Sequence, residues 1–544
     1  MKLPTGTILP FMAWSAPRPS IRGEPDITTT SAQAVIRAAG AGATCDWFKQ
    51  PVDHKNPKSG SWQQMYCVNA DNWAGPGSPI VVMTPGESSI YSALSSGGKG
   101  YSFLENTTMT GLYAQSIGAA TVVIEHRYFG GSSPYDGFDS ETLQYLTMEQ
   151  AAADLVSFAN NVVFPFETNK TSVASKAPWI YFGASYSATL GSWIERFYPD
   201  VFFAFHLSSA TISANTENWY YYDTIRKGID SFRGDTSCSL ALNEVSGFVD
   251  KYLLASNRNE TEVQAVKLLF GSSFPIEDDD FAYSIATPFR YWQETNGYRD
   301  VLEMCDAVVG ASETVQDAIL GTVPASVVNY AAYFRMNFRD STCTYLDTWG
   351  QEDPLWCLNT HNPWNPFYEA RTLGNPWRTW YWFLCNEPLA SWATGAPKES
   401  PLSIVSRKID AQYWQKQCEL HFPPENGQKY GSSKGKTPET LNKLTGGWVR
   451  NSTRVIWTSG EFDPWRATGM SSEVRPGGAL PSSENIAVFL IKNAVHGDDA
   501  FSTRALNNLK IKVNPEVVKV QEQAVALVKK WVERYYAGKK SGTA

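Results

Sequence analysis

Short apolar runs recur near the two ends of the chain, and most of them stop abruptly at small or polar residues. A run that is apolar throughout is typical of a strand buried on both faces. Because helix-like stretches separate these runs, the pattern predicts a mostly parallel sheet with helices on both faces. The runs are PIVVMT (79–84), ATVVIEH (120–126), PWIYF (178–182), RVIWTS (454–459) and IAVFLI (486–491).

Helical stretches are predicted from their caps and from their apolar spacing. Thr147 and Gln150 have the spacing of a capping box and predict a helix over the following residues. Near the end of the chain, Asn514 and Pro515 are suited to the N-cap and first positions of a helix that runs to about Tyr536.

The apolar run at 178–182 leads into Gly183-Ala184-Ser185-Tyr186-Ser187. A strand that stops at G-x-S and continues into a helix is typical of a nucleophile elbow, in which small neighbours let the serine hydroxyl stand clear of the backbone. Ser187 stands where a second glycine is usual. The motif makes Ser185 a candidate nucleophile, against the alternative of an ordinary serine in a strand-to-helix turn.

Two later runs end near an aspartate and a histidine, Asp463 and His496. A serine hydroxyl needs an imidazole to take its proton, and a buried carboxylate fixes the tautomer of that imidazole. The chain order serine, aspartate, histidine is that of the α/β-hydrolase triad. We therefore predict an α/β-hydrolase core with Ser185, Asp463 and His496 as catalytic residues.

Residues adjacent to these motifs are candidates for the rest of the site. The backbone N–H of Tyr186, the residue after the nucleophile, is predicted to be the first oxyanion donor. The second is predicted from Gly86 or Glu87 in the loop after the 79–84 run, with Gly86 favoured because it lacks a Cβ. Tyr186 and Trp465 lie beside the triad in sequence and are predicted to line the substrate pocket. Glu87 and Glu387 are the acidic residues expected to face the cleft.

The long separation between Ser185 and Asp463 predicts an insertion, because connections within one domain are usually short. We predict a catalytic domain over 41–214 and 446–540, and an inserted, mainly helical cap domain over 215–445. The later part of the insertion is rich in Trp, Pro and Asn. Residues 1–40 contain a short apolar stretch and prolines, and are predicted to be a signal or leader segment.

Composition narrows the partners and the compartment. The net charge of −8 argues against nucleic acid or an anionic membrane as a partner. The eight cysteines contain no C-x-x-C pair, which argues against a zinc site and favours disulfides in a secreted chain, with the pairing left open. Sequons predict glycosylation at Asn106, Asn169, Asn259 and Asn451.

Six segments occur in an order that resembles the proline-specific serine peptidases, which include lysosomal Pro-X carboxypeptidase, dipeptidyl peptidase II and secreted fungal acid prolyl endopeptidases. The resemblance spans roughly 45–535 and is closest to the fungal enzymes. The segments are FKQPVDH (48–54), EHRYFGGSSP (125–134), YLTMEQAAADL (145–155), GASYS (183–187), WFLCNE (382–387) and GEFDPWR (460–466).

The resemblance implies cleavage after proline, an acidic working pH and the triad already named. It adds Trp382 as a candidate pocket residue. Glu87 and Glu387 would bind a substrate amine in an aminodipeptidase, or take no part in an endopeptidase. The resemblance also implies proline-containing peptides or proteins as substrates, a monomer or homodimer, and a secreted, vacuolar or lysosomal location. No cofactor or metal is expected.

Several readings stay open from the sequence. The leading one is an acid-active prolyl endopeptidase; a Pro-X carboxypeptidase or an aminodipeptidase would differ in what closes the ends of the cleft. An esterase on the same fold would hydrolyse simple esters without a preference for proline. A non-catalytic binding protein would lack a triad member, and none is missing here.

Overall fold

The computed structural model of the 544-residue chain describes most of residues 42–541. The predicted leader, residues 1–40, lies outside the described part. The described ranges are 42–94, 101–167, 169–272, 276–310, 313–339, 359–365, 368, 370–372, 375–387, 392–425, 427–450 and 452–541.

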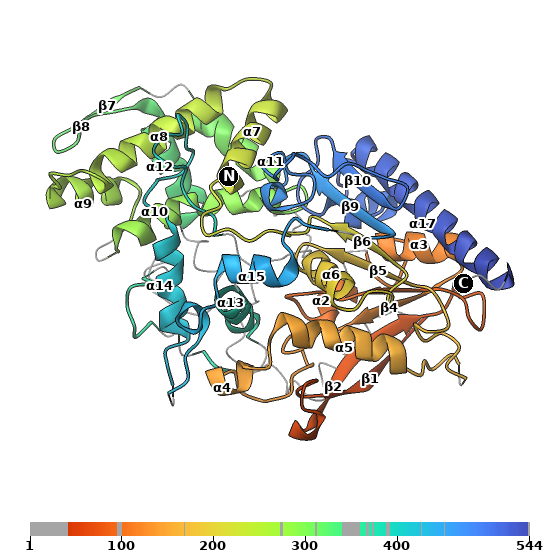
Figure 1. Cartoon of the computed structure of the whole chain (residues 1–544). Helices are drawn as coiled ribbons and strands as arrows, with labels where there is room; N and C mark the ends of the chain where they lie inside the picture. The colour runs from red at the N-terminus through yellow and green to blue at the C-terminus, as the bar shows by residue number, and fades with distance from the viewer. Residues whose placement is uncertain are drawn as a thin grey trace.

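An eight-stranded sheet runs through one half of the molecule (Figure 1). Its strand order is β1-β2-β4-β3-β5-β6-β9-β10. The first two pairings in this order are antiparallel, and the remaining five are parallel. The strands are β1 (Ala43–Pro51), β2 (Ser61–Asn69), β3 (Ile80–Met83), β4 (Ala120–Ile124), β5 (Trp179–Ala184), β6 (Ala204–Ser208), β9 (Val455–Gly460) and β10 (Ile486–Ile491).

Helices cover both faces of this sheet, and the strand residues alternate between two cores because successive side chains point to opposite faces. On β3, Ile80 and Val82 join the core under α5 and α6, whereas Val81 and Met83 join the core under α3 and α17. The helices of this half are α2 (Ile90–Leu94), α3 (Met109–Ile117), α4 (Ser140–Leu143), α5 (Met148–Asn161), α6 (Tyr186–Phe197), α16 (Thr503–Asn508) and α17 (Pro515–Ser541); short 3-10 turns are η1 (Pro57–Ser59), η7 (Arg466–Thr468) and η8 (Asp498–Ala500).

This arrangement is an α/β-hydrolase fold, which confirms the predicted fold class. All five predicted apolar runs are strands of the parallel part of the sheet. The antiparallel strands β1 and β2 were not predicted. β1 is at the sheet edge and is largely exposed, so it is not apolar throughout. β2 mixes polar with apolar residues over its first half.

The predicted helix caps are confirmed in part. Thr147 caps α5 by accepting a hydrogen bond from the backbone of Gln150. The Gln150 side chain does not complete a capping box, because it donates to the Asp53 carboxylate and accepts from the backbone N–H of His54. Asn514 bonds the first turn of α17, and that helix continues past the predicted end at Tyr536.

Between β6 and β9 the described chain is mainly helical and has a core of its own. This core includes Tyr222, Val249, Trp292 and Tyr413, and it also takes in Phe462 from the loop after β9. The placement of a domain boundary at 215 and 445 stays a prediction. The elements are α7 (Tyr220–Arg233), α8 (Ser237–Leu253), α9 (Glu260–Leu269), α10 (Asp278–Ala286), η2 (Thr287–Gln293), α11 (Tyr298–Val308), β7 (Val315–Asp317), β8 (Gly321–Val323), α12 (Ala325–Asn337), α13 (Pro376–Asn386), α14 (Ala411–His421), η6 (Gly431–Lys434) and α15 (Pro438–Thr445).

Three disulfides join neighbouring elements of the described chain. They connect β1 to β2, α8 to α11 and α13 to α14, through Cys45–Cys67, Cys238–Cys305 and Cys385–Cys418. Disulfide bonds persist in oxidising compartments, so these three are consistent with a secreted protein. Cys343 and Cys357 lie outside the described residues.

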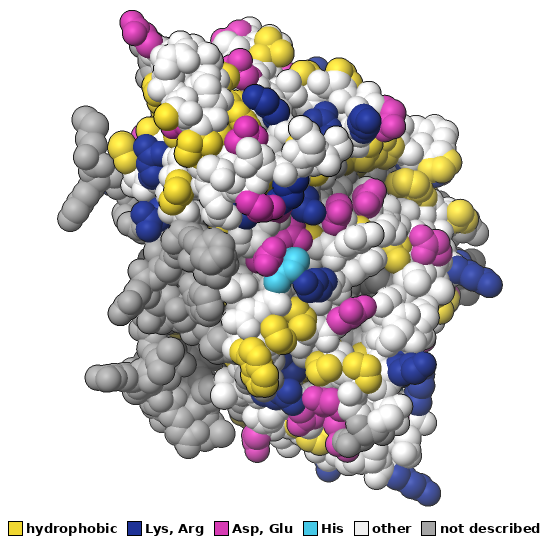
Figure 2. All heavy atoms as spheres, turned by 90° about the vertical axis from the view of Figure 1, so that its left-hand side faces the viewer, with side chains coloured by type: hydrophobic (Ala, Val, Ile, Leu, Met, Phe, Trp, Pro, Cys, Tyr) yellow, Lys and Arg dark blue, Asp and Glu magenta, His cyan; other side chains and the backbone are white. Residues whose placement is uncertain are grey.

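The surface of the described chain carries charges of both signs. Figure 2 shows acidic and basic side chains interspersed on one face, without a large field of either sign. No helix among the described residues is both long and apolar enough to cross a bilayer.

The predicted glycosylation sites differ in exposure. Asn169 and Asn259 are exposed, whereas Asn106 is half-buried and its side-chain oxygen accepts a hydrogen bond from Arg504. Asn451 lies outside the described residues. Modification of these four asparagines stays a prediction.

Candidate active site

Ser185 lies at the sharp turn between β5 and α6. Its backbone has φ 53° and ψ −123°, a strained conformation for a residue with a Cβ. Gly183 is required at this turn, because a Cβ there would lie 2.6 Å from the Ser187 carbonyl oxygen. Ser187 is tolerated since its hydroxyl lies 3.1 Å from the Tyr181 hydroxyl in a polar niche. The local geometry is that of a nucleophile elbow.

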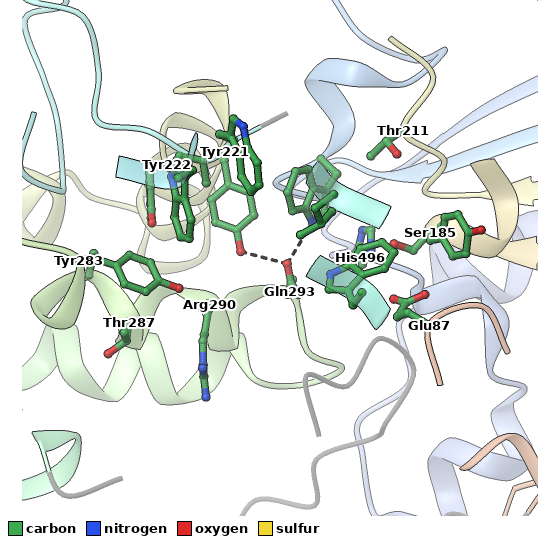
Figure 3. Close-up of a pocket in the computed structure, with 18 of the residues that line it drawn as sticks. Glu87, Ser185, Thr211, Tyr221, Tyr222, Tyr283, Thr287, Arg290, Gln293 and His496 are labelled. Carbon is green, nitrogen blue, oxygen red and sulfur yellow. Dashed lines mark hydrogen bonds between the residues drawn. The ribbon is translucent and has the colours of Figure 1, made fainter. Parts of the chain in front are cut away.

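Asp463 and His496 come from the loops after β9 and β10 and are bonded to each other. The distance from His496 Nδ1 to Asp463 Oδ1 is 2.7 Å, and both side chains are buried. Because a carboxylate only accepts, Nδ1 carries the proton and Nε2 is left as an acceptor. Among the described residues His496 Nε2 has no hydrogen-bond partner, and His496 lines the same cavity as Ser185 (Figure 3).

Gly86 brings the loop after β3 against the start of α6. Its φ of 69° is in the left-handed region, and a Cβ there would lie 3.2 Å from Tyr186 Cδ1 and 3.4 Å from the Ser187 backbone nitrogen. The first N–H groups of a helix have no intrahelical partner and favour negative charge. Gly86 and Tyr186 are therefore close together at a position suited to an oxyanion.

A cavity of about 1060 Å³, counting the space open to solvent, extends from Ser185 toward the helical half. Of the sequence-predicted residues, it brings together Ser185, His496, Tyr186, Trp465 and Glu87. Most of the other lining side chains belong to the segment 215–445. The exception is Thr211, and those of the segment are Tyr221, Tyr222, Tyr283, Ala286, Thr287, Arg290, Gln293, Trp380, Tyr381, Leu384, Trp392, Ala393 and Trp414.

Trp465 is held in place from the opposite side of this cavity. Its indole Nε1 and the Tyr221 hydroxyl both donate to Gln293 Oε1, each at 3.0 Å (Figure 3). The Tyr221 ring also packs edge-on against Trp465, with 5.0 Å between centroids. The loop that carries Asp463 is thus tied to the helical half through the tryptophan two residues later.

A family model described as "Serine carboxypeptidase S28" matches residues 50–518, which is most of the chain. The chain belongs to this peptidase family. Serine protease vicPb of Bipolaris victoriae is 33% identical over 497 residues, covering 90% of this chain and 89% of that protein. The human thymus-specific serine protease is 30% identical over 488 residues, covering 86% and 84%. These matches make the protein an S28 serine peptidase.

Weaker matches also extend along most of this chain. A probable extracellular serine carboxypeptidase of Arthroderma benhamiae is 26% identical over 514 residues, covering 89% of this chain and 67% of that protein. Among solved structures, an acetylester hydrolase from Corynebacterium glutamicum covers 89% of this chain and 95% of its own, at 9% identity and a TM-score of 0.35. A proline iminopeptidase from Mycobacterium smegmatis covers 90% and 98%, at 9% identity and a TM-score of 0.31.

Trp382 does not line the cavity of this S28 peptidase, contrary to the expectation from the resemblance. It is 3% exposed, its Nε1 donates to the Leu146 carbonyl at 3.1 Å, and its ring packs on Phe422 and Tyr430. Helical spacing explains the difference. Trp380 and Leu384, one turn apart on α13, share the face that lines the cavity, and Trp382 points the other way.

Glu387 is also absent from the described cavity wall. The residue is 3% exposed, and its carboxylate pairs with Lys436 at 3.1 Å. Glu87, in contrast, lines the cavity, and burial raises its pKa to about 7. Glu87, Arg290 and His496 are the acidic and basic side chains of the described lining.

The two aspartates after His496 have separate surroundings. Asp499 accepts hydrogen bonds from Ser208 and Thr458 and contacts His206, and these bonds lower its pKa. Asp498 accepts from the Val495 backbone, and burial raises its pKa to about 7. Asp463 is thus the carboxylate that is hydrogen-bonded to His496.

The remaining histidines of the catalytic half are all hydrogen-bonded to other side chains. His206 contacts the Tyr113 hydroxyl at 2.8 Å and lies in the sheet core. His54 pairs with Asp154 at 2.7 Å rather than with its sequence neighbour Asp53. The His126 ring is bonded to Tyr186 at 2.8 Å.

Proposed function

We propose that this S28 peptidase hydrolyses peptide bonds on the carboxyl side of proline, as an acid-active prolyl endopeptidase. The observation that carries the proposal is an aromatic-walled cavity that begins at Ser185 and His496. A proline ring is compact and apolar and has no N–H to satisfy, so aromatic faces such as Trp465 and Trp380 are suited to hold it.

Roles follow from the bonding of each side chain. Ser185 Oγ attacks the scissile carbonyl carbon while His496 Nε2 takes its proton, and Asp463 stabilises the resulting imidazolium. The oxyanion is bound by the backbone N–H groups of Tyr186 and Gly86. His496 then gives the proton to the leaving amine, which departs from an acyl-enzyme. Water, deprotonated by His496, attacks this ester and restores Ser185.

An acidic working range is supported by the carboxyl groups near the histidine. Burial raises the pKa of Glu87 and of Asp498 to about 7, so both are neutral in acid. In their neutral forms these two groups place no negative charge beside the reacting atoms. A neutral Glu87 also does not repel the developing oxyanion next to Gly86.

The mode of cleavage has a second candidate. Arg290 lines the described cavity and offers a cation for a substrate carboxylate, which favours a Pro-X carboxypeptidase. Glu87 in its ionised form would instead pair with a free substrate amine, as an aminodipeptidase requires. We also propose that residues 215–445 act as a cap, since residues of that segment form most of the described cavity wall. Secretion is the remaining part of the proposal, and the three disulfides support it.

The test uses one peptide with an internal Pro-X bond, prepared with both ends blocked or with either end free. Assays run at about pH 4.5 and about pH 7, two values that bracket the ordinary histidine pKa. For wild type we expect cleavage after proline in the blocked peptide at about pH 4.5. It is expected to disappear in Ser185→Ala. Cleavage only with a free carboxyl or amino end assigns the exopeptidase modes instead. Cleavage of simple esters without any Pro-X peptide would make the protein an esterase.

A further inference from the structure

His126 is buried at the carboxyl end of β4, next to the strand that leads to Gly86, and it takes no part in the steps above. It is 3% exposed. Its Nδ1 lies 2.8 Å from the Arg127 carbonyl oxygen, and its Nε2 lies 2.8 Å from the Tyr186 hydroxyl. Because the carbonyl only accepts, Nδ1 carries the proton, and Nε2 accepts from the Tyr186 hydroxyl.

The Tyr186 side chain contacts two parts of the candidate site as well as His126. Its ring packs edge-on against Trp380 in the cavity wall, with 5.4 Å between centroids. On another side its Cδ1 is the atom that a Cβ on Gly86 would approach to 3.2 Å. Any rotation of the Tyr186 ring would therefore disturb both the wall and the oxyanion residue.

The backbone that holds His126 is itself anchored. The Arg127 guanidinium donates to both oxygens of Asp154 on α5, at 2.6 and 2.7 Å. It also donates to the carbonyl oxygens of Val52 and Tyr145. Arg127 and its carbonyl are thus fixed in the core. Because His126 is bonded to that carbonyl and to the Tyr186 hydroxyl, it fixes the position of the Tyr186 side chain.

We infer that His126 is a positioning residue, which holds the Tyr186 ring against Gly86 and Trp380. It thereby sets which substrate residue is preferred on the amino side of the cleaved bond. The inference rests on the proposed function only in taking that preferred residue to be proline.

The neutral state that this bond requires persists in acid. Burial lowers the pKa of His126 to about 4. The charged groups around it are Arg127 and Asp154, which pair with each other. Glu125 also lies nearby, where its carboxyl group accepts from the Ile90 and Gly131 backbones, and burial raises its pKa to about 7. Glu87 and Glu387 act on the Tyr186 side of the bond.

The experiment measures the ratio of kcat/KM for a proline substrate to that for its alanine analogue. His126→Leu and Tyr186→Phe each remove the bond and are expected to lower this ratio about tenfold, the worth of one buried hydrogen bond. The double variant is expected to lose no more than the worse single variant, because one interaction is lost in all three. His126→Gln, which offers an amide oxygen near Nε2, is expected to recover most of the ratio.

Tyr113→Phe is the matched control. It removes a buried tyrosine–histidine bond of the same 2.8 Å length, to His206, in the sheet core rather than at the cavity. We expect a similar loss of thermal stability but a ratio within about twofold of wild type. Labelling of Ser185 by a fluorophosphonate counts the folded active sites in every preparation.

Two outcomes would overturn the inference: a wild-type ratio in labelled His126→Leu and Tyr186→Phe, or fully additive losses in the double variant. If wild type prefers a residue other than proline, the proposed function is wrong. The same ratio, taken for that residue over alanine, still tests His126.

Discussion

The two sides of the cavity are built in different ways. On the sheet side, Glu87, Ser185 and His496 follow the ends of β3, β5 and β10, and Asp463, bonded to His496, follows β9. On the other side, the wall comes from helices and loops far apart in the chain, such as Tyr221, Gln293 and Trp414. Chemistry is thus carried by positions tied to strand ends, and shape by positions that tertiary packing selects.

The largest expected effect comes from comparing two hydrogen-bond acceptors: Asp463, which orients His496 on the sheet side, and Gln293, which orients Trp465 on the other side. Asp463→Asn should lower kcat/KM about 10⁴-fold, since the amide favours the wrong tautomer of His496. Gln293→Ala should cost about tenfold or less, because it only frees the Trp465 indole and the Tyr221 hydroxyl. Steady-state kinetics on a proline peptide measures both. Equal losses would erase the distinction between the two sides.

Two tryptophans of α13 sharpen the same comparison within one helix. Trp380→Ala opens the cavity wall and should lower the preference for proline over alanine about tenfold or more. Trp382→Ala should leave that preference unchanged and lower the free energy of unfolding by about 3–5 kcal/mol, as for other buried large-to-small changes. Selectivity assays and chemical denaturation separate them. A loss of selectivity in Trp382→Ala would return that residue to the pocket.

A smaller effect concerns the charge beside the oxyanion hole. Burial raises the Glu87 pKa from its ordinary value of 4.5 to about 7, so the group is neutral in acid and ionises as the pH rises through 7. Wild-type activity should fall above that pH, as the carboxylate opposes the oxyanion.

Glu87→Gln should keep its activity there and exceed wild type by about fivefold near pH 8, with little change near pH 5. The matched control is Glu387→Gln, a buried carboxyl outside the described lining, and pH–rate profiles test the pair. Identical profiles for wild type and Glu87→Gln would remove Glu87 from the alkaline limb.

The smallest effect is on stability. Burial raises the pKa of Glu87, Glu125, Asp280 and Asp498 to about 7 in the folded protein. Each group binds its proton more tightly when folded, so its stabilisation is complete below the unfolded pKa and is lost as the pH rises through about 7.

The Tm should therefore be higher near pH 5 than near pH 8 by about 3–5 °C. Scanning calorimetry at the two pH values, with Glu125→Gln as a variant that flattens the difference, tests this. Three of the four groups lie on the sheet side, so most of the pH-dependent stabilisation should come from that side. A higher Tm at pH 8 would contradict the assignment.

Much of the sheet side was predicted from the sequence because it depends on local rules. Five apolar runs became parallel strands, since only residues buried on both faces are apolar throughout. The elbow at Ser185 was visible from its small neighbours, and His496 and Asp463 from their places after strands. The antiparallel strands β1 and β2 were not predicted, because β1 is an exposed edge strand and the first half of β2 mixes polar with apolar residues.

The sequence by itself therefore determined the fold class, the peptidase family and the residues that meet at the strand ends. The tertiary structure alone decided which aromatic side chains face the cavity, as Trp380 and not Trp382 does, and which acidic residue stays there, as Glu87 and not Glu387 does. It also decided that His126 is bonded to Tyr186. The physical reason is that strand ends bring residues together through backbone pairing, whereas a helix face is chosen by what packs against it.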